Sequence, residues 1–120
     1  MSEPNFLVSR EFHFDAAHHL PNYNGKCEVE HGHRWQLRVT VKAPLDRHTG
    51  MAMDFHEIDM VVRDTVLESL DHTNLNRLLD NPSAENLCLW CWDRLADRLP
   101  LHQVEIWETP RSKVVYRPGI

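Results

Sequence analysis

The sequence has no long apolar run, no secretory leader pattern and few cysteines. None of its apolar stretches approaches the roughly 20 residues that a membrane-spanning helix needs, so we expect no membrane partner. Residues 1–5 lack the basic-then-apolar pattern of a signal peptide, which favours a cytoplasmic protein. Three cysteines are an odd number and indicate free thiols instead of a disulfide framework. Two of them, Cys88 and Cys91, fall on one stripe of a predicted helix, where core packing is expected.

An excess of positive charge is also missing. The 120 residues carry 13 Lys and Arg against 18 Asp and Glu, a net charge of −5. This balance argues against a general nucleic-acid or membrane-surface binder, although a local cationic pocket for a phosphorylated small molecule remains compatible with it. No repeat, low-complexity run or linker interrupts the chain. We therefore expect one domain that covers residues 1–120.

Hydrophobic periodicity predicts the elements of this domain. Apolar residues alternate over 6–17 and again over 35–41, which is the period of half-buried strands. They recur at helical spacing over 55–70, after Asp54 as an N-cap, and a second helix is expected from Ser83 to about Leu99. Two short strands at 103–108 and 113–117 close the chain. The order ββααββ predicts an α+β domain with two helices on one face of an antiparallel sheet, and the open edges of that sheet favour oligomerisation.

Nine histidines are the unusual feature of the composition, and three of them fall in phase on the predicted strands. His31 and His33 point to the same face of an extended segment, about 6.5 Å apart along the chain. His18 shares the apolar parity of the first strand, so a hairpin would gather all three imidazoles at one end. Three histidines with an open fourth position are typical of catalytic zinc, although imidazole also suits other divalent metals. Chance occurrence of His-x-His on a strand is the alternative. The parity of His19 turns it away, and surface or turn positions are expected for His13, His48, His56 and His102.

Three further groups could take part in chemistry beside such a metal. Cys27 lies four residues before His31; a thiol near a dication shifts toward thiolate, while a small buried hydrophobe is the alternative. Asp71 and His72 could form a carboxylate-oriented acid–base pair, or be ordinary charges at a helix end. Glu108 continues an apolar parity, where a carboxylate needs a partner. That partner is either a ligand with two N–H donors in one plane or an arginine.

Six short motifs follow one another along nearly the whole chain. They are Phe14-Asp15-Ala16-Ala17-His18, Cys27-x-x-x-His31-Gly32-His33, Thr49-Gly50-x-x-x-Asp54-Phe55, Leu70-Asp71-His72-x-Asn74-Leu75-Asn76, Pro82-Ser83-Ala84-Glu85-Asn86 and Glu108-Thr109. In this order they resemble the 6-pyruvoyl-tetrahydropterin synthase family. The short Cys-x-x-x-His-Gly-His spacing is similar to its bacterial branch, the 6-carboxy-tetrahydropterin synthases of the queuosine pathway.

The resemblance implies the T-fold (tunnelling fold), in which ββααββ subunits join their sheets into a barrel, commonly as a homohexamer of two trimers. The implied substrate is 7,8-dihydroneopterin triphosphate, and the implied products are 6-carboxy-tetrahydropterin, acetaldehyde and triphosphate. The implied roles are Zn²⁺ ligation by His18, His31 and His33, general base catalysis by Cys27, a proton relay from a neighbouring subunit by Asp71 with His72, and pterin binding by Glu108, Thr109 and Ser83.

Two departures from the family pattern leave the product open. Ala84 stands where related enzymes often have a Ser or Thr that touches the pterin. Glu30 gives Cys-x-x-Glu-His-Gly-His, which looks like a subgroup that cleaves the side chain to 6-hydroxymethyl-dihydropterin for folate synthesis. A pyruvoyl product, a non-catalytic zinc- or pterin-binding module and a generic zinc hydrolase are the other hypotheses. Nothing in the sequence selects among the candidates for triphosphate binding, which are Lys26, Arg34, Arg111 and Lys113.

Overall fold

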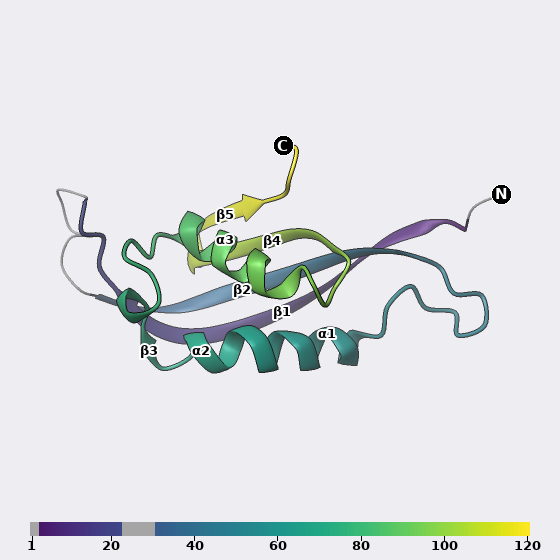
Figure 1. Ribbon diagram of the computed structural model, residues 1–120, viewed down its shortest axis with the longest axis horizontal. Coiled ribbons are helices and arrows are strands. Elements are labelled where there is room, and N and C mark those ends of the chain that lie inside the picture. Colours follow the sequence, from purple (N-terminus) through teal and green to yellow (C-terminus); the bar gives the residue numbers. More distant parts are fainter. Residues whose placement is uncertain (1–2, 23–30) are drawn as a thin grey trace.

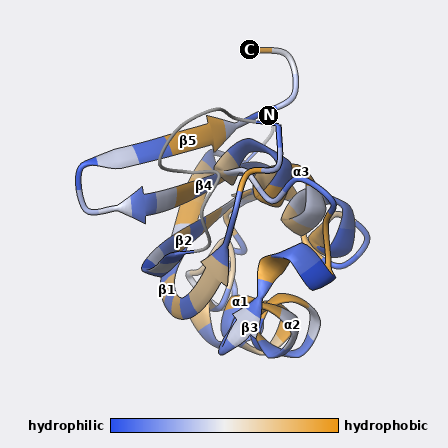
Figure 2. Cartoon of the chain, turned by 90° about the vertical axis from the view of Figure 1, so that its left-hand side faces the viewer, coloured by the Kyte–Doolittle hydropathy of each residue, from blue (hydrophilic) through white to orange (hydrophobic). Residues whose placement is uncertain are grey.

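The chain folds into two layers, a five-stranded sheet and a layer of helices on one of its faces (Figures 1 and 2). The computed structural model describes residues 3–22 and 31–120. The strands lie in the order β3-β1-β2-β4-β5. Within the described ranges, no helix is long and apolar enough to cross a membrane.

Two long strands form the centre of the sheet. β1 (Asn5–His18) and β2 (His31–Pro44) pair antiparallel along their whole length. β4 (Leu101–Thr109) pairs antiparallel with β2, and β5 (Ser112–Tyr116) pairs antiparallel with β4. The four predicted strands are therefore present, with the pairing expected of an antiparallel sheet.

A fifth strand was absent from the prediction. β3 (Thr73–Asn74) follows the first helical segment and pairs in parallel with β1 at Ala16 and Ala17. The sheet is mixed for this reason. Two residues carry no measurable periodicity, so this strand has no signal in the sequence.

The helices form where the apolar spacing places them. α1 (Phe55–Val62), a π-helical turn η2 (Arg63–Leu67) and α2 (Glu68–Leu70) run on from one another, and Asp54 caps the start by accepting a hydrogen bond from the backbone N of His56. Ser83 caps α3 (Ala84–Leu95) through its hydroxyl, which accepts from the backbone N of Asn86. α3 ends four residues before the predicted limit because the chain turns at 96–99, ahead of Pro100.

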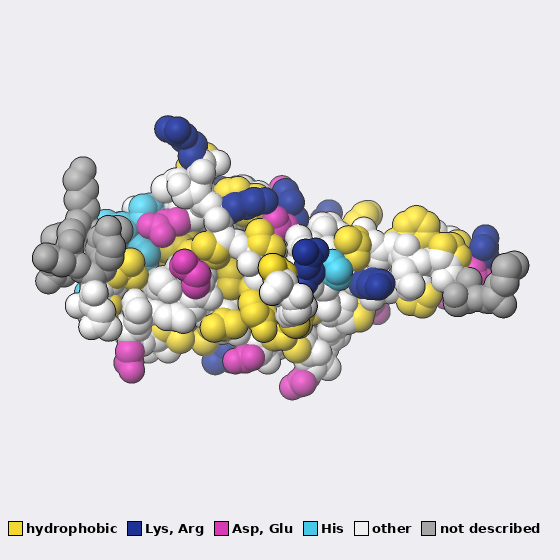
Figure 3. Space-filling view, turned by 90° about the horizontal axis from the view of Figure 1, so that it is seen from above, with side chains coloured by type: hydrophobic (Ala, Val, Ile, Leu, Met, Phe, Trp, Pro, Cys, Tyr) yellow, Lys and Arg dark blue, Asp and Glu magenta, His cyan; other side chains and the backbone are white. Residues whose placement is uncertain are grey.

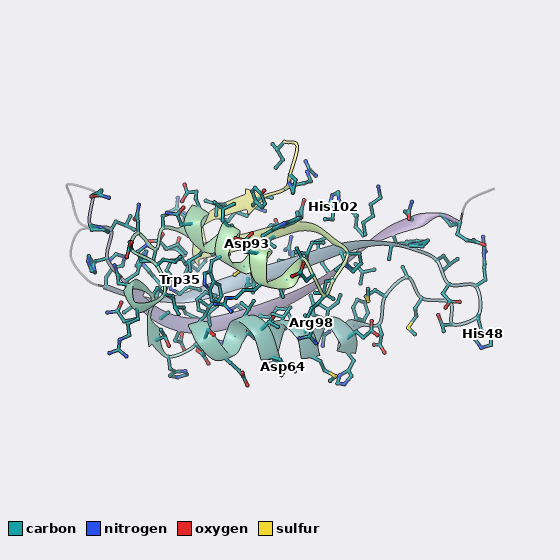
Figure 4. All side chains as sticks on the ribbon, viewed as in Figure 1. Trp35, His48, Asp64, Asp93, Arg98 and His102 are labelled. Atoms are coloured by element: carbon teal, nitrogen blue, oxygen red, sulfur yellow. The ribbon has the colours of Figure 1, made fainter. Side chains whose placement is uncertain are left out.

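The core lies between the sheet and the helices. Phe12 and Phe14 of β1 and the odd-numbered residues of β2 from Trp35 to Val41 are buried against α1, η2 and α3, and Figure 2 shows hydrophobic segments in both the sheet and the helical layer. Cys88 and Cys91 belong to this core, as predicted. The chain measures 54 × 28 × 25 Å, and Figure 4 places Trp35 in its interior and His48 at the far end of the long axis.

Two apolar side chains depart from the predicted pattern. Phe6 is 48% exposed because this end of the β1–β2 ribbon extends beyond the helices. Phe55, the first apolar residue of the helical pattern, is 54% exposed and lies under the guanidinium of Arg10, 5.6 Å from the ring centre. Periodicity assigns both residues to a core that does not reach them.

Candidate metal and substrate site

The register of β1 with β2 brings the three predicted metal ligands together. His18 lies directly opposite His31, and His33 lies opposite Ala16. Directly opposed residues share one face of an antiparallel pair, with Cβ atoms about 4.5–5.5 Å apart. Residues i and i+2 of a strand also share a face. The three imidazoles therefore occupy the helix-facing side at one end of the molecule, where Figure 3 shows histidine side chains beside acidic ones.

The ring nitrogen atoms of this cluster converge. Nε2 of His18 lies 2.9 Å from Nε2 of His31. Each of the three histidines and Glu108 offers one possible ligand atom, and these four atoms all lie within 4.8 Å of one another. Nε2 of His33 is buried and lacks a hydrogen-bond partner of good geometry among the described residues. A buried polar atom without a partner costs free energy. A bound cation would remove this cost.

Trp35 forms the floor of the cluster. Its indole ring is fully buried and meets the rings of His18 and His33 edge-on, with centroids 4.9 and 5.5 Å apart. Its indole N–H donates to the backbone O of Ala16 at 3.2 Å. The apolar surroundings restrict the rotamers of the two imidazoles, which is the support that a metal site requires.

The loop before α3 orients His18. Nδ1 of His18 lies 2.8 Å from the backbone O of Pro82, and a carbonyl oxygen can only accept, so Nδ1 carries the proton. In the neutral ring, Nε2 then has a free lone pair directed at the cluster. Ser83, one residue further along, is committed to capping α3. Its predicted contact with substrate stays a prediction.

The electrostatics favour the neutral form of His33. Burial lowers the pKa of His33, and the neighbouring His31 and His18 lower it further, while Glu108 acts in the opposite direction. Imidazole binds metal only in its neutral form. The nitrogen donor set, its convergence and the buried Nε2 of His33 all fit a zinc ion, which the three histidines would hold.

Glu108 lies against the histidines instead of an arginine. Its Oε1 is 3.1 Å from Nε2 of His33, 3.6 Å from that of His18 and 3.8 Å from that of His31. The alternative partner, an arginine, is not found at Glu108 among the described residues. Arg38 pairs with a different carboxylate of β4: its Nη1 lies 3.2 Å from Glu105, which is almost fully buried. The parity of Glu108 predicted a partnered carboxylate, but its contact with the metal ligands was missed.

A cavity of about 340 Å³ opens beside Glu108 where β2 and β4 separate. Their pairing ends at Gln36 and Trp107, so the first residues of β2 and the last residues of β4 line the gap between the two strands. His33 and Arg34 contribute from β2, and Glu108 and Thr109 from β4. A flat heterocycle in this cavity would reach the Glu108 carboxylate and the histidine cluster together. Of the triphosphate candidates that the structure describes, Arg34 lines this cavity.

Asp71 and His72 lie at the opposite edge of β1. The backbone N of Asp15 donates to Oδ1 of Asp71 at 2.9 Å, and this hydrogen bond is the main reason why the pKa of Asp71 is lowered. Nδ1 of His72 lies 3.1 Å from the same carboxylate, and its backbone has a φ of 58°. That left-handed conformation is uncommon outside glycine and presents an exposed imidazole. The predicted pair is therefore formed, but it is not among the groups that converge on the histidine cluster.

Several predicted residues remain apart from the cluster. Cys27, Lys26 and Glu30 lie outside the described residues. Lys113 is bound to Glu105 at 2.9 Å. The backbone N of His19 donates to Asn76. The other histidines are exposed or partly buried, as expected: His13, His48, His56 and His102.

The fold and the cluster define a class of protein: a T-fold domain with three histidines and one glutamate gathered at the end of its central hairpin. A family model described as 6-pyruvoyl tetrahydropterin synthase matches residues 7–119, so the chain belongs to the 6-pyruvoyl tetrahydropterin synthase family. It is 37% identical to 6-carboxy-5,6,7,8-tetrahydropterin synthase of Synechocystis, over 92% of each chain.

Two further comparisons extend this result. The chain is 39% identical to dihydroneopterin monophosphate aldolase of Pyrococcus furiosus, over 79% of this chain and 82% of that protein. The structure of Caenorhabditis elegans 6-pyruvoyl tetrahydropterin synthase has the same fold, with a TM-score of 0.89, 24% identity and 99% of each chain covered. The sequence relatives with similar identity to this chain thus carry different enzyme names.

Proposed function

We propose that this protein converts 7,8-dihydroneopterin triphosphate to 6-carboxy-5,6,7,8-tetrahydropterin, with zinc bound by His18, His31 and His33, and thereby serves queuosine biosynthesis. The observation that carries the proposal is the convergence of three imidazole nitrogens and one carboxylate beside a cavity open to small molecules. The Synechocystis relative, whose name states the carboxy product, supports this assignment.

The residues of the chain divide the work of binding and proton transfer. Zinc, when bound, supplies Lewis acidity that stabilises developing charge on a side-chain oxygen of the substrate. Glu108 accepts two N–H groups from the pterin ring, a bidentate contact that fixes the ring's orientation, and Thr109 closes the same side of the cavity. Cys27 removes a proton from the side-chain carbon, and His72, oriented by Asp71, returns one from the other side.

Assembly is part of the proposal, because the Asp71–His72 pair of one chain is not part of that chain's histidine cluster. Glu108 and the three histidines are on the helix-facing side of β1, β2 and β4, while Asp71 and His72 lie beyond the other edge of β1. The exposure of His72 leaves it available to a neighbouring chain. A trimer or hexamer would deliver the pair from one subunit to the cluster of the next.

Product analysis tests the proposal directly. The zinc-loaded protein is incubated with dihydroneopterin triphosphate, and the products are identified by mass. We expect 6-carboxy-tetrahydropterin, acetaldehyde and triphosphate in equal amounts. A glycolaldehyde-type fragment, or a pyruvoyl product that keeps all side-chain carbons, would refute the carboxy assignment while leaving the enzyme class intact.

Side-chain cleavage to 6-hydroxymethyl-dihydropterin is the second candidate. The Pyrococcus furiosus relative is named as a dihydroneopterin monophosphate aldolase, and in the sequence Glu30 stands directly before His31. The same assay is repeated with Glu30→Ala and Cys27→Ala. A glycolaldehyde fragment that persists in Cys27→Ala and disappears in Glu30→Ala would support the aldolase reaction.

A non-catalytic zinc- or pterin-binding module is the alternative of another class. It predicts that Cys27→Ala leaves every measurable property unchanged. A Cys27→Ala protein that keeps stoichiometric zinc but loses turnover contradicts the binding module. Turnover of simple esters that survives in both Cys27→Ala and Glu108→Ala would instead favour a generic zinc hydrolase.

A further inference from the structure

The position of the Glu108 carboxylate carries information beyond pterin binding. Among the described carboxylate oxygens, Oε1 of Glu108 alone lies within 4 Å of Nε2 of all three histidines. The distances are 3.1 Å to His33, 3.6 Å to His18 and 3.8 Å to His31. Glu108 faces both the cavity and the histidine cluster.

The distances match those between two ligands of one ion. Nitrogen and oxygen ligands about 2.0–2.2 Å from zinc in a tetrahedral arrangement lie roughly 3.3–3.5 Å from one another. The separations from Oε1 to the nitrogens, 3.1–3.8 Å, bracket this range. An oxygen of Glu108 therefore occupies the place of a fourth ligand relative to the three imidazoles.

Glu108 also has room to leave this place. The last residue pair between β2 and β4 is Gln36 with Trp107, and Glu108 follows it on β4. On the side of β2, therefore, Glu108 has no paired residue that restrains it. Its side chain is 27% exposed and lines the cavity of about 340 Å³. The flexible side chain of a glutamate can reach either the cluster or the cavity from one backbone position.

We propose that Glu108 is the fourth ligand of the metal in the substrate-free protein and moves to the pterin ring when a pterin binds. The inference rests on the metal site of the proposed function and adds a gate to it. Binding of the ring removes Glu108 from the ion and opens the fourth position to the side-chain oxygens of the substrate. Water is kept from the ion until the pterin is in place, which suppresses hydrolytic side reactions.

Metal affinity and Co²⁺ absorption test the first half of this proposal. We expect Glu108→Gln to bind zinc at least about tenfold more weakly in chelator competition, since even outer-shell partners of zinc ligands are worth 10–100-fold. Its Co²⁺ form should show a visible spectrum different from that of the parent protein, because a water replaces the carboxylate. Glu11→Gln is the matched control: this carboxylate binds Arg38 and is absent from the histidine cluster.

Unsubstituted pterin, which has no side-chain oxygens, tests the second half. Added to the Co²⁺ protein, it should shift the parent spectrum toward that of Glu108→Gln. Equal zinc affinity and equal spectra in parent and variant would overturn the inference, as would an unchanged parent spectrum when pterin fluorescence shows that the ring is bound. If the parent protein gives these results and still forms the carboxy product, the proposed function is retained and only the role of Glu108 as a metal ligand is refuted. Failure to bind zinc or Co²⁺ would overturn both.

Discussion

Replacement of His33 by leucine should have opposite effects on stability with and without metal. Nε2 of His33 is a buried nitrogen that has Oε1 of Glu108 3.1 Å away but no hydrogen bond of good geometry among the described residues. Leaving such a group unsatisfied costs about 1–3 kcal/mol. Because the side chain is 21% exposed, we take the lower end, about 1 kcal/mol. A leucine there packs against Trp35, whose ring lies 5.5 Å from that of His33.

The metal-free His33→Leu protein should therefore be more stable than the parent by about 1 kcal/mol, which corresponds to a Tm increase of roughly 3–5 °C in a chain of this size. Zinc should reverse the order. A ligand that binds only the folded state stabilises it by about 2.7 kcal/mol at a hundredfold excess over its Kd. The parent gains this stabilisation, while the variant, with two imidazoles left, loses most of it.

Thermal unfolding followed by circular dichroism, in chelator and in excess zinc, measures both effects. Protein concentration is held constant, because the Tm of an oligomer depends on it. His56→Leu, which replaces an exposed histidine on α1, serves as the control and should change neither Tm. A metal-free His33→Leu protein that is less stable than the parent, or one that gains as much from zinc, would refute this account of the site.

Three further predictions concern protonation, capping and thiols. Without metal, the free energy of unfolding should fall as the pH drops below about 6.5, because burial lowers the pKa of His33 and the unfolded chain takes up its proton first. Urea titrations of the parent and of His33→Leu at several pH values measure this fall, which should be smaller in the variant. Ser83→Ala should cost about 1 kcal/mol by removing the cap of α3, whereas Ser83→Asp should keep the cap. A KM increase shared by both variants would identify a separate contact with substrate. Cys88 and Cys91 should react with a thiol reagent only on unfolding, since burial raises both pKa values, that of Cys88 to about 12.

The parts of the fold that the sequence predicts are those with local causes. Burial on one side of a strand or helix leaves a period of 2 or 3.6 in the sequence, so β1, β2 and the helical segments appear there with their buried faces. The same parity assigns His18, His31 and His33 to one face. Caps are equally local, and Asp54 and Ser83 were both predicted.

The parts that the sequence does not predict depend on which segments meet in space. β3 exists because residues 73–74 lie beside β1, and nothing within those residues indicates this. The hydrogen bond from His18 to the backbone O of Pro82 joins positions 64 residues apart, and any residue can supply a carbonyl oxygen. The contact of Glu108 with the histidines depends on where β4 parts from β2, which is a property of strand lengths and pairing.

Strand pairing also fixes the relative positions of the metal ligands. His18 lies opposite His31 because β1 and β2 pair over 14 positions in one register. A slip of one residue would move every side chain of β1 to the other face. Phe12 and Phe14 would then leave the core together with His18. The hydrophobic free energy that holds these aromatic rings in place, about 2 kcal/mol for each, thus also fixes the distance between two metal ligands. The core and the site are specified by the same pairing, so a change that weakens the register should impair metal binding before it unfolds the chain.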